Sequence, residues 1–443
     1  MQRGSELERQ GVRLVACTMV DNAGVTRVKG VPVSRIDHVS RFGVGLSNVF
    51  AVFAVDDHIT SSPGFEGPSG DMRLVPDMAA AVVLAGGPGW AWAPVDQYDQ
   101  EGEPMPVCQR SILKQAVERA LREGLSFKMS FEVEFTLFDA GGKPLHTGPG
   151  YSPWAFLPAE GFAVDLLEAL AAQGIAVEQI HPEYSTGQYE ISVSAASPLA
   201  AADRHVLLRL TIRRLAHRHG LKASFSPVAI AGEVGNGSHL HLSAWRAGDN
   251  LMAGGNGPEG LTDAGEHMVA GLLDHLPGMA GFLAPSVASW DRLQPSHWSG
   301  AYTCWGVENR EAALRMIKGM KGTRARAANV EVKTIDGTAN PYIAATLVIS
   351  AALDGVHNER RLPAPVTLDP DTLDERERSA HGIERLPADL TEALARMEKA
   401  ELPRAALGEA LYEAFLAVRR LELESYGAAD IEKKAELLRW KYG

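Results

Sequence analysis

The spacing of apolar residues predicts a β-rich beginning of the chain and a larger part in which helices and strands alternate. Residues 11–35 predict a β-hairpin, because β-prone runs lie on both sides of the turn-forming Asp21–Gly24. After residue 105, apolar side chains recur at helical spacing from Ile112 to Leu121, and Gly124 suits a helix end. We therefore expect a small N-terminal domain over residues 1–104 and a larger domain over residues 105–443.

Further helices are predicted by the same periodicity. They cover residues 161–173 and 198–219, and a charged, helical tail covers residues 369–443. The stretch from Met78 to Val95 carries no charged side chain, but glycines interrupt it, and a membrane-spanning helix needs about 20 continuous apolar residues. This stretch predicts a buried strand followed by a turn, so no membrane partner is expected.

Composition and charge narrow the class of protein. The 443 residues include 43 Lys and Arg against 55 Asp and Glu, a formal net charge of −12. This surplus argues against general binding to nucleic acid; it is compatible with a cation site but usually reflects only an acidic, solvated surface. Three cysteines in no paired spacing and an amino terminus without an apolar signal segment predict a cytoplasmic protein without disulfides.

One short strand carries two carboxylates on a single face. In the run from Phe131 to Phe135, alternation places Glu132 and Glu134 on one side and three apolar side chains on the other. Neighbouring carboxylates repel each other, so a compensating cation explains the pair. An edge strand with its acidic face in solvent is the alternative.

Three more segments repeat this arrangement. In the first of these, which is the second segment of the chain, Glu190 lies on the polar face of a strand, and the turn at Gly187 can bring Glu183 back toward it. The third places His239, His241 and Ser243 on one face, and the fourth alternates from Val330 to Lys333 around Glu331. Carboxylates with one or two imidazoles suit Mg²⁺ or Mn²⁺ better than a closed zinc site, and such ions usually serve phosphate chemistry.

Arginines provide the complementary groups. Arg292, Arg310 and Arg315 are suited to bidentate contacts with phosphate or carboxylate groups, although Glu308 or Glu311 could simply pair with them at the surface. The chain has no Walker A loop and no Gly-x-Gly-x-x-Gly fingerprint. A nucleotide would therefore be held by metal ions and arginines.

In this order, these segments resemble the glutamine synthetase family over nearly the whole chain. The resemblance rests on Glu132-x-Glu134, Glu183 with Gly187-Gln188-x-Glu190, Gly235-x-Gly237-x-His239-x-His241, Asn309-Arg310 with Arg315, and Asn340-Pro341-Tyr342. It implies an α+β fold, with a small N-terminal β-grasp domain and a large C-terminal catalytic domain. The catalytic domain would contain a curved antiparallel sheet, a half-barrel, surrounded by helices.

The resemblance also implies roles for single residues. Two or more Mg²⁺ or Mn²⁺ ions would be bound, the first by Glu134, Glu183 and Glu190 and the second by Glu132, His239 and Glu331. ATP would be contacted by Glu178, His241 and Ser243, and the transferring phosphoryl group by Arg310 and Arg315. Gly235 and Arg292 would position glutamate, whose γ-carboxylate is phosphorylated by ATP before an amine displaces phosphate.

Some positions depart from the family pattern. Ammonia-using members have a flap glutamate six residues after the arginine that corresponds to Arg292, whereas this chain has Trp298. An indole cannot deprotonate ammonium, so the chain resembles the branch of γ-glutamylpolyamine and γ-glutamyl-monoamine synthetases. The other ammonium-site group of the family is an N-terminal aspartate, for which Asp57 is the candidate, with Asp56 beside it.

Three further departures lie near the substrates. Val234 replaces an asparagine that contacts glutamate, Lys333 replaces an arginine on the substrate side, and Asn329 replaces an arginine near the nucleotide, where Arg324 or Arg326 could substitute. Lys333 keeps the charge without the bidentate geometry. The metal ligands are all retained, which favours an active enzyme.

The leading hypothesis is an ATP-dependent carbon–nitrogen ligase that couples glutamate to a small organic amine, either an ethanolamine-like monoamine or a polyamine. The alternatives are an ammonia-using glutamine synthetase and a non-catalytic, nucleotide-binding regulator of the same fold. The resemblance implies a homo-oligomer of twelve chains in two rings, with active sites between subunits.

Overall fold

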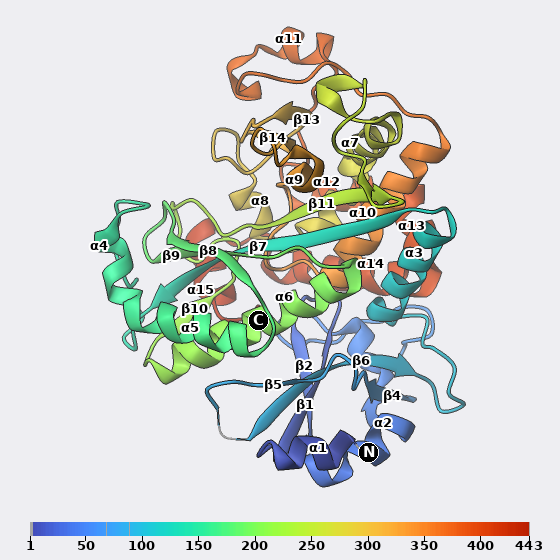
Figure 1. Cartoon of the computed structure of the whole chain (residues 1–443), viewed down its shortest axis with the longest axis vertical. Helices are drawn as coiled ribbons and strands as arrows, with labels where there is room; N and C mark the ends of the chain where they lie inside the picture. Colours follow the sequence, from blue (N-terminus) through green and yellow to red (C-terminus); the bar gives the residue numbers. More distant parts are fainter. Residues whose placement is uncertain (1–2, 68, 88, 443) are drawn as a thin grey trace.

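The computed structural model describes residues 3–67, 69–87 and 89–442. The start of the chain forms a small sheet with two helices, at the bottom of Figure 1, and the rest forms a large sheet surrounded by helices. The α+β fold predicted from the sequence is confirmed. Within the described residues, no helix combines the length and the apolar character needed to cross a membrane.

The small sheet has the strand order β2-β1-β6-β4-β3, with β5 beside β6. Its strands are β1 Leu14–Val20, β2 Thr26–Pro32, β3 Val44–Ser47, β4 Asp71–Pro76, β5 Val82–Val83 and β6 Trp90–Tyr98. Helices α1 Arg3–Arg9 and α2 Ile36–Phe42 and the 3₁₀ helices η1 Val33–Arg35 and η2 Asn48–Val52 accompany them. β1 and β2 pair antiparallel, with Leu14 opposite Pro32, so the predicted hairpin is confirmed.

The uncharged stretch from Met78 to Val95 forms strands and a turn. Its main strand, β6, follows the turn and pairs with β1 in parallel and with β4 and β5 antiparallel. Trp92 and Val95 are buried. The prediction of a buried strand with a turn is thus confirmed, except that the long strand comes after the turn; Pro88 lies outside the described residues.

The large sheet has nine strands in the order β13-β14-β15-β11-β7-β9-β8, with β10 beside β7 and β12 beside β11. The strands are β7 Ser126–Phe138, β8 Val177–Pro182, β9 Gln188–Val193, β10 Lys222–Ser224, β11 Ser238–Arg246, β12 Asp249–Asn250, β13 Tyr302–Val307, β14 Ala312–Ile317 and β15 Asn329–Val332. Every pairing in it is antiparallel except β13 with β14, which is parallel.

Helices surround this sheet (Figure 1). The longer ones are α3 Gln109–Arg122, α5 Glu160–Ala172, α6 Pro198–Arg218, α7 Asp263–Leu283, α10 Pro341–His357 and α14 Glu409–Tyr426. The shorter ones are α4 Pro153–Phe156, α8 Ser289–Arg292, α9 Arg324–Ala327, α11 Glu375–Ala380, α12 Leu390–Met397, α13 Glu401–Leu407 and α15 Ile431–Leu438, with 3₁₀ helices η3 Leu157–Ala159, η4 Pro258–Gly260 and η5 Pro370–Thr372. The predicted helices near residues 112–121, 161–173 and 198–219 and the helical tail are confirmed.

The alternation in β7 separates the core from the cavity described below. Phe131, Val133 and Phe135 are almost completely buried in the main hydrophobic core, against which α6 packs. Because successive side chains of a strand point to opposite faces, Glu132 and Glu134 must lie on the other face. The apolar side of β7 therefore fixes where its carboxylates point.

Candidate active site

Strand register brings the polar faces of five strands together. Residues directly opposite each other on neighbouring strands share a face of the sheet. Glu132 on β7 lies opposite His239 on β11, and Glu134 lies opposite Glu190 on β9. Two more cross-strand pairings extend this face, His241 with Glu331 and Glu331 with Arg315. The four segments singled out in the sequence therefore converge on one surface.

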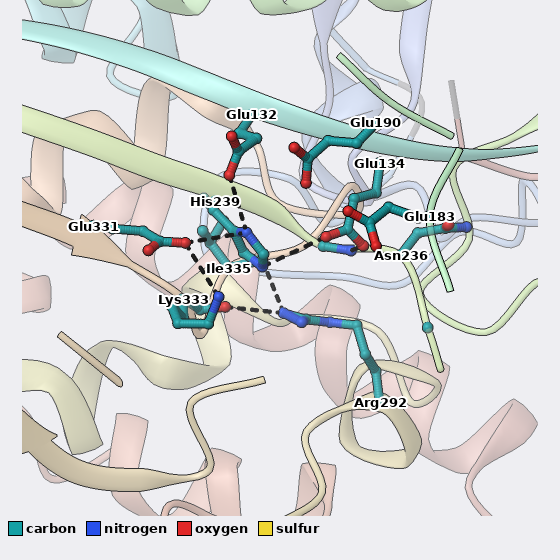
Figure 2. A network of polar contacts seen from close by, with 12 residues as sticks. Glu132, Glu134, Glu183, Glu190, Asn236, His239, Arg292, Glu331, Lys333 and Ile335 are labelled. Atoms are coloured by element: carbon teal, nitrogen blue, oxygen red, sulfur yellow. Dashed lines mark hydrogen bonds and ion pairs between the residues drawn. The ribbon is translucent and has the colours of Figure 1, made fainter. Parts of the chain in front are cut away.

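This surface forms the wall of a cavity of about 890 Å³. The cavity is lined by most of the predicted site residues, namely Glu132, Glu134, Glu183, Glu190, Gly235, His239, His241, Arg292, Trp298, Arg310, Arg315, Glu331 and Lys333. Figure 2 shows the carboxylates and His239 on one side and Arg292 and Lys333 on the other. Predictions made from separate segments thus meet in a single site.

Three predicted residues lie outside the residues that line the cavity. Glu178 is exposed and accepts a hydrogen bond from the Ser194 hydroxyl, and Ser243 is buried and accepts one from Trp245 Nε1 at 2.9 Å. Asp57 lies in the N-terminal part, where Arg27 donates to its carboxylate at 2.6 Å. Their assigned roles remain predictions.

Glu331 has the strongest cationic surroundings in the cavity. Its carboxylate lies 3.2 Å from His239 Nδ1, 3.2 Å from Lys333 Nζ and 3.1 Å from an Arg315 nitrogen. Burial alone would raise the pKa of Glu331, but Lys333, His239 and His241 outweigh it and lower the pKa to about 2. Glu331 is therefore ionised at neutral pH.

Glu190 has the opposite surroundings. Burial and the nearby carboxylates of Glu132, Glu134 and Glu183 raise its pKa well above the usual range. Glu132, in contrast, has a lowered pKa, because contacts with His239 and His241 outweigh burial. Closely spaced carboxylates of this kind are a donor set that a divalent cation would stabilise.

Three groups of possible metal ligands overlap in this cavity among the described residues. They are Glu132 with Glu190 and His239, Glu132 with His241 and Glu331, and His181 with Glu183 and Glu190, each with its ligand atoms within 4.8 Å of one another. The oxygen-rich composition with imidazoles fits Mg²⁺ or Mn²⁺. The donor set therefore fits the divalent ions expected from the sequence.

The Gly187 turn places Glu183 beside Glu190, as the sequence predicted. Gly187 has φ +70°, and a Cβ there would lie 2.7 Å from the Leu137 carbonyl oxygen. The amide of Glu183 donates to the Gln188 carbonyl at 2.9 Å, which closes the hairpin of β8 and β9. Both carboxylates are contacted by His181 Nε2, at 3.0 Å for Glu183 and 3.5 Å for Glu190.

The opposite wall of the cavity carries buried cations. Arg292, only 4% exposed, donates to the carbonyl oxygens of Lys333 and Ile335 at 3.1 and 2.9 Å, and its Nε has no hydrogen-bond partner among the described residues. Burial lowers the pKa of Arg292. Gly235 lies against it, because a Cβ there would meet Arg292 Cγ at 2.6 Å and the Pro227 carbonyl at 2.0 Å. Only glycine fits this close approach.

Several cavity residues were not assigned roles from the sequence, and four of them have informative positions. Gln188 donates to Glu134 at 3.0 Å and so orients that carboxylate, and His181 contacts two glutamates. His181 could have been found, because it lies two residues before Glu183 and strand alternation gives them one face. Tyr151 and Tyr184 also line the cavity, but they lie in irregular segments whose pattern carries no such signal.

The fold and the cavity define a protein whose glutamate-rich sheet could hold divalent cations, with arginines beside it that are suited to phosphate. The glutamine synthetase catalytic-domain model matches residues 106–437, and the glutamine synthetase N-terminal-domain model matches residues 3–101. The chain belongs to the glutamine synthetase family. The family resemblance and the enzyme class predicted from the sequence, a carbon–nitrogen ligase, are confirmed.

Individual relatives are similar along almost the whole chain. A gamma-glutamylpolyamine synthetase of Streptomyces coelicolor is 48% identical over 443 residues, covering 99% of this chain and 95% of the relative. A glutamine synthetase of Pyrococcus abyssi is 31% identical, covering 94% and 91%.

Two solved structures show the same arrangement. One, described as a novel glutamine synthase homolog, has a TM-score of 0.88 and 33% identity and covers 97% of this chain and 99% of its own. A GmaS/ADP complex has a TM-score of 0.85 and 28% identity and covers 99% of each chain.

Proposed function

We propose that the protein couples the γ-carboxylate of glutamate to an organic amine of the polyamine class, at the expense of ATP. The observation that carries this proposal is the cavity itself, which combines a full set of glutamate and histidine ligands with an indole, Trp298, at its edge. The similarity to a gamma-glutamylpolyamine synthetase, at 48% identity, supports the choice of amine.

The reaction has two balanced steps. The γ-carboxylate oxygen attacks the γ-phosphorus of ATP, the bond to the ADP oxygen breaks, and an acyl phosphate forms. The neutral amine nitrogen then attacks the acyl carbon, the carbon–oxygen bond to phosphate breaks, and the nitrogen gives up a proton as the amide forms. Activation is needed because a carboxylate is a poor electrophile, whereas phosphate is a good leaving group.

The glutamate face would bind the divalent ions. Glu134, Glu183 and Glu190 would hold one ion, with His181 beside them, and Glu132, His239 and Glu331 the other. Such ions, when bound, neutralise charge on the phosphate oxygens during transfer. Gln188 and the amide of Gly237, which donate to Glu134 at 3.0 and 2.7 Å, would hold that carboxylate in position.

Arginines would stabilise the phosphoryl group. Arg315 contacts Glu331 and Glu308 at 3.1 and 2.8 Å, so its guanidinium is held at the edge of the metal site. Arg310 is exposed in the turn between β13 and β14 and points over the Trp298 ring, 5.6 Å from its centroid. Both guanidinium groups are suited to bidentate contacts with the phosphoryl oxygens.

The opposite wall would hold glutamate. The buried Arg292 and Lys333 place positive charge beside Gly235, whose missing side chain leaves room for the close approach of a substrate. Glu178, His241 and Ser243 would contact ATP, and His241 is fixed by a 3.0 Å hydrogen bond between its Nδ1 and Asn329.

Asp57 would take part in the reaction from another subunit. It lies outside the cavity of its own chain, which supports an assembly in which the N-terminal part of one chain faces the cavity of the next, as in the proposed dodecamer of two rings.

The domain division is proposed between residues 104 and 105, in the interval between the two matched family models. The three cysteines are buried and unpaired, which supports a cytoplasmic location.

The test is phosphate release from ATP and glutamate in the presence of a panel of amines. We expect turnover with diamines and polyamines to exceed turnover with ammonium. If ammonium matches or exceeds every organic amine, the amine assignment is wrong and the protein is a glutamine synthetase in the narrow sense. If the protein binds Mg-ATP but turns over none of the amines, the alternative of a non-catalytic, nucleotide-binding regulator is supported.

A further inference from the structure

Three aromatic side chains from separate segments line the mouth of the cavity. They are Tyr151 in the loop before α4, Tyr184 between β8 and β9, and Trp298 between α8 and β13. Their exposed fractions are 52%, 52% and 44%. Aromatic rings this exposed at a cavity commonly contact a ligand, and the phosphoryl transfer proposed above uses neither tyrosine.

The rings contact each other in a row. The Tyr184 and Trp298 ring centroids are 5.2 Å apart, and the ring planes are nearly perpendicular, at 88°. The Tyr151 and Tyr184 centroids are 5.5 Å apart at 64°. Perpendicular rings leave an inside corner with one aromatic face on each side. A chain of methylene groups lying in this corner would contact both rings.

Polar contacts of the backbone keep these rings in place. The Trp298 amide donates to Glu311 at 2.8 Å, and the Tyr184 amide donates to Glu183 at 3.2 Å. The Tyr151 hydroxyl also donates to Glu183, at 2.5 Å. Among the described residues, the Tyr184 hydroxyl has no hydrogen-bond partner. These contacts fix the backbone from which the Tyr184 and Trp298 rings project and hold the Tyr151 ring by its hydroxyl, and the Tyr184 hydroxyl is available at the rim of the corner.

We propose that Tyr184 and Trp298 form the subsite for the tail of a diamine or polyamine, and that Tyr184 determines the preference for a second ammonium group. The methylene groups pack in the corner, and the distal ammonium lies against the aromatic face of Tyr184, whose quadrupole attracts cations. Arg310 already occupies one side of the Trp298 ring, so like-charge repulsion directs the distal ammonium toward Tyr184. The inference rests on the proposed function.

The test compares four amines in steady-state kinetics of the full-length enzyme: methylamine, n-butylamine, 1,4-diaminobutane and spermidine. Tyr184→Phe keeps the ring, Tyr184→Leu keeps only apolar bulk, and Tyr184→Ala removes both. The matched control is Trp154→Ala, because Trp154 is also exposed, at 76%, but lies outside the residues that line the cavity. Melting temperature and the KM for glutamate and ATP are measured for every variant.

Tyr184→Ala should raise the KM for 1,4-diaminobutane about tenfold with little change in kcat, because a cation–π contact contributes a factor of about 2–5 and the ring also covers methylene groups. Tyr184→Leu should raise the KM for 1,4-diaminobutane while leaving that for n-butylamine within about twofold. Tyr184→Phe and Trp154→Ala should resemble the wild type, and the KM for methylamine should stay unchanged throughout.

The inference is overturned if Tyr184→Ala and Tyr184→Leu leave the diamine KM unchanged, or if they change the KM of all four amines equally. In either case turnover of diamines would still support the proposed function. Failure of the proposed function gives a different result, because the wild type would then prefer ammonium over every amine in the panel.

Discussion

At the scale of single residues, the cavity is defined by which charges are compensated and which are not. Glu331 contacts the cations Arg315 and Lys333 as well as the His239 imidazole and keeps its charge, whereas Glu190 faces three other carboxylates. Arg292, on the opposite wall, is buried and donates to two backbone carbonyls. The crowded carboxylates around Glu190 and the Arg292 Nε, which has no hydrogen-bond partner among the described residues, mark the places where a cation and an anionic substrate would complete the site.

Glu132 belongs to two of the three overlapping ligand groups, so we expect Glu132→Gln to reduce turnover at least ~100-fold. The amide keeps the shape of the side chain but loses the charge that binds a divalent ion. The measurement is phosphate release at saturating substrates. Glu168→Gln, an exposed position on α5, should keep wild-type activity; equal activity of both variants would contradict the assigned role.

Trp298→Glu tests the amine side of the cavity. The new carboxylate attracts ammonium, and the loss of the indole removes the aromatic face that would contact an organic amine. The ratio of kcat/KM for ammonium to kcat/KM for 1,4-diaminobutane should therefore rise at least ~10-fold. Trp298→Gln removes the ring without adding charge and serves as the control. If both variants change the ratio equally, the new carboxylate has no part in amine selection.

At the scale of elements, alternation along strands could be predicted from the sequence, but pairing between strands could not. The pattern from Phe131 to Phe135 is local, so it correctly assigned the faces of β7. That Glu134 lies opposite Glu190 depends on register between strands more than 50 positions apart, which no local pattern determines. Tyr151 and Tyr184 were missed for a related reason, since they reach the cavity from irregular segments.

Arg110 links three elements through buried ion pairs. It is 3% exposed and contacts Asp96 on β6, Asp203 on α6 and the nearby Asp77 at 2.9–3.1 Å. Asp96 keeps Lys114 at 2.6 Å when Arg110 is removed, but the buried Asp203 loses the one cation that contacts it among the described residues, which costs about 3–5 kcal/mol.

Arg110→Met should therefore lower the free energy of unfolding by about 3–5 kcal/mol in a urea titration. The control is Arg122→Met, at an exposed position at the end of α3, the helix that also contains Arg110; this variant should leave the free energy of unfolding nearly unchanged. Equal losses in the two variants would show that Arg110 does not stabilise the junction of these elements.

At the scale of the whole molecule, helix α14, the last but one of the described helices, contacts the N-terminal loop that carries Asp57. The Val55 amide donates to Glu422 at 2.9 Å, and the Tyr426 hydroxyl donates to Asp56 at 2.5 Å. Glu422 is also paired with Arg419 at 2.9 Å. The loop at residues 55–56 and helix α14 are thus joined next to a predicted catalytic residue.

This junction predicts a pH dependence of stability. Burial raises the pKa of Glu422 to about 7 in the folded state, although Arg419 opposes it. The folded protein binds the Glu422 proton more tightly than the unfolded chain does, so protonation of Glu422 stabilises the fold. This stabilisation is fully present below the pKa of an unfolded glutamate, about 4.3, and is lost as pH rises through about 7.

Wild type should therefore lose stability relative to Glu422→Gln between pH 5 and pH 8, measured by urea unfolding of both proteins at each pH. Glu424→Gln, two residues further along the helix and exposed, is the control. A difference between wild type and Glu422→Gln that stays constant, or grows in favour of the wild type with rising pH, would contradict the assignment.

The central claim is the choice of an organic amine over ammonia, and one competition experiment tests it most directly. Equal concentrations of ammonium and 1,4-diaminobutane are supplied together with ATP, Mg²⁺ and glutamate, and both products are quantified by mass spectrometry. We expect the γ-glutamyl amide of the diamine to exceed glutamine, with one phosphate released per amide formed. Glutamine as the main product would contradict it.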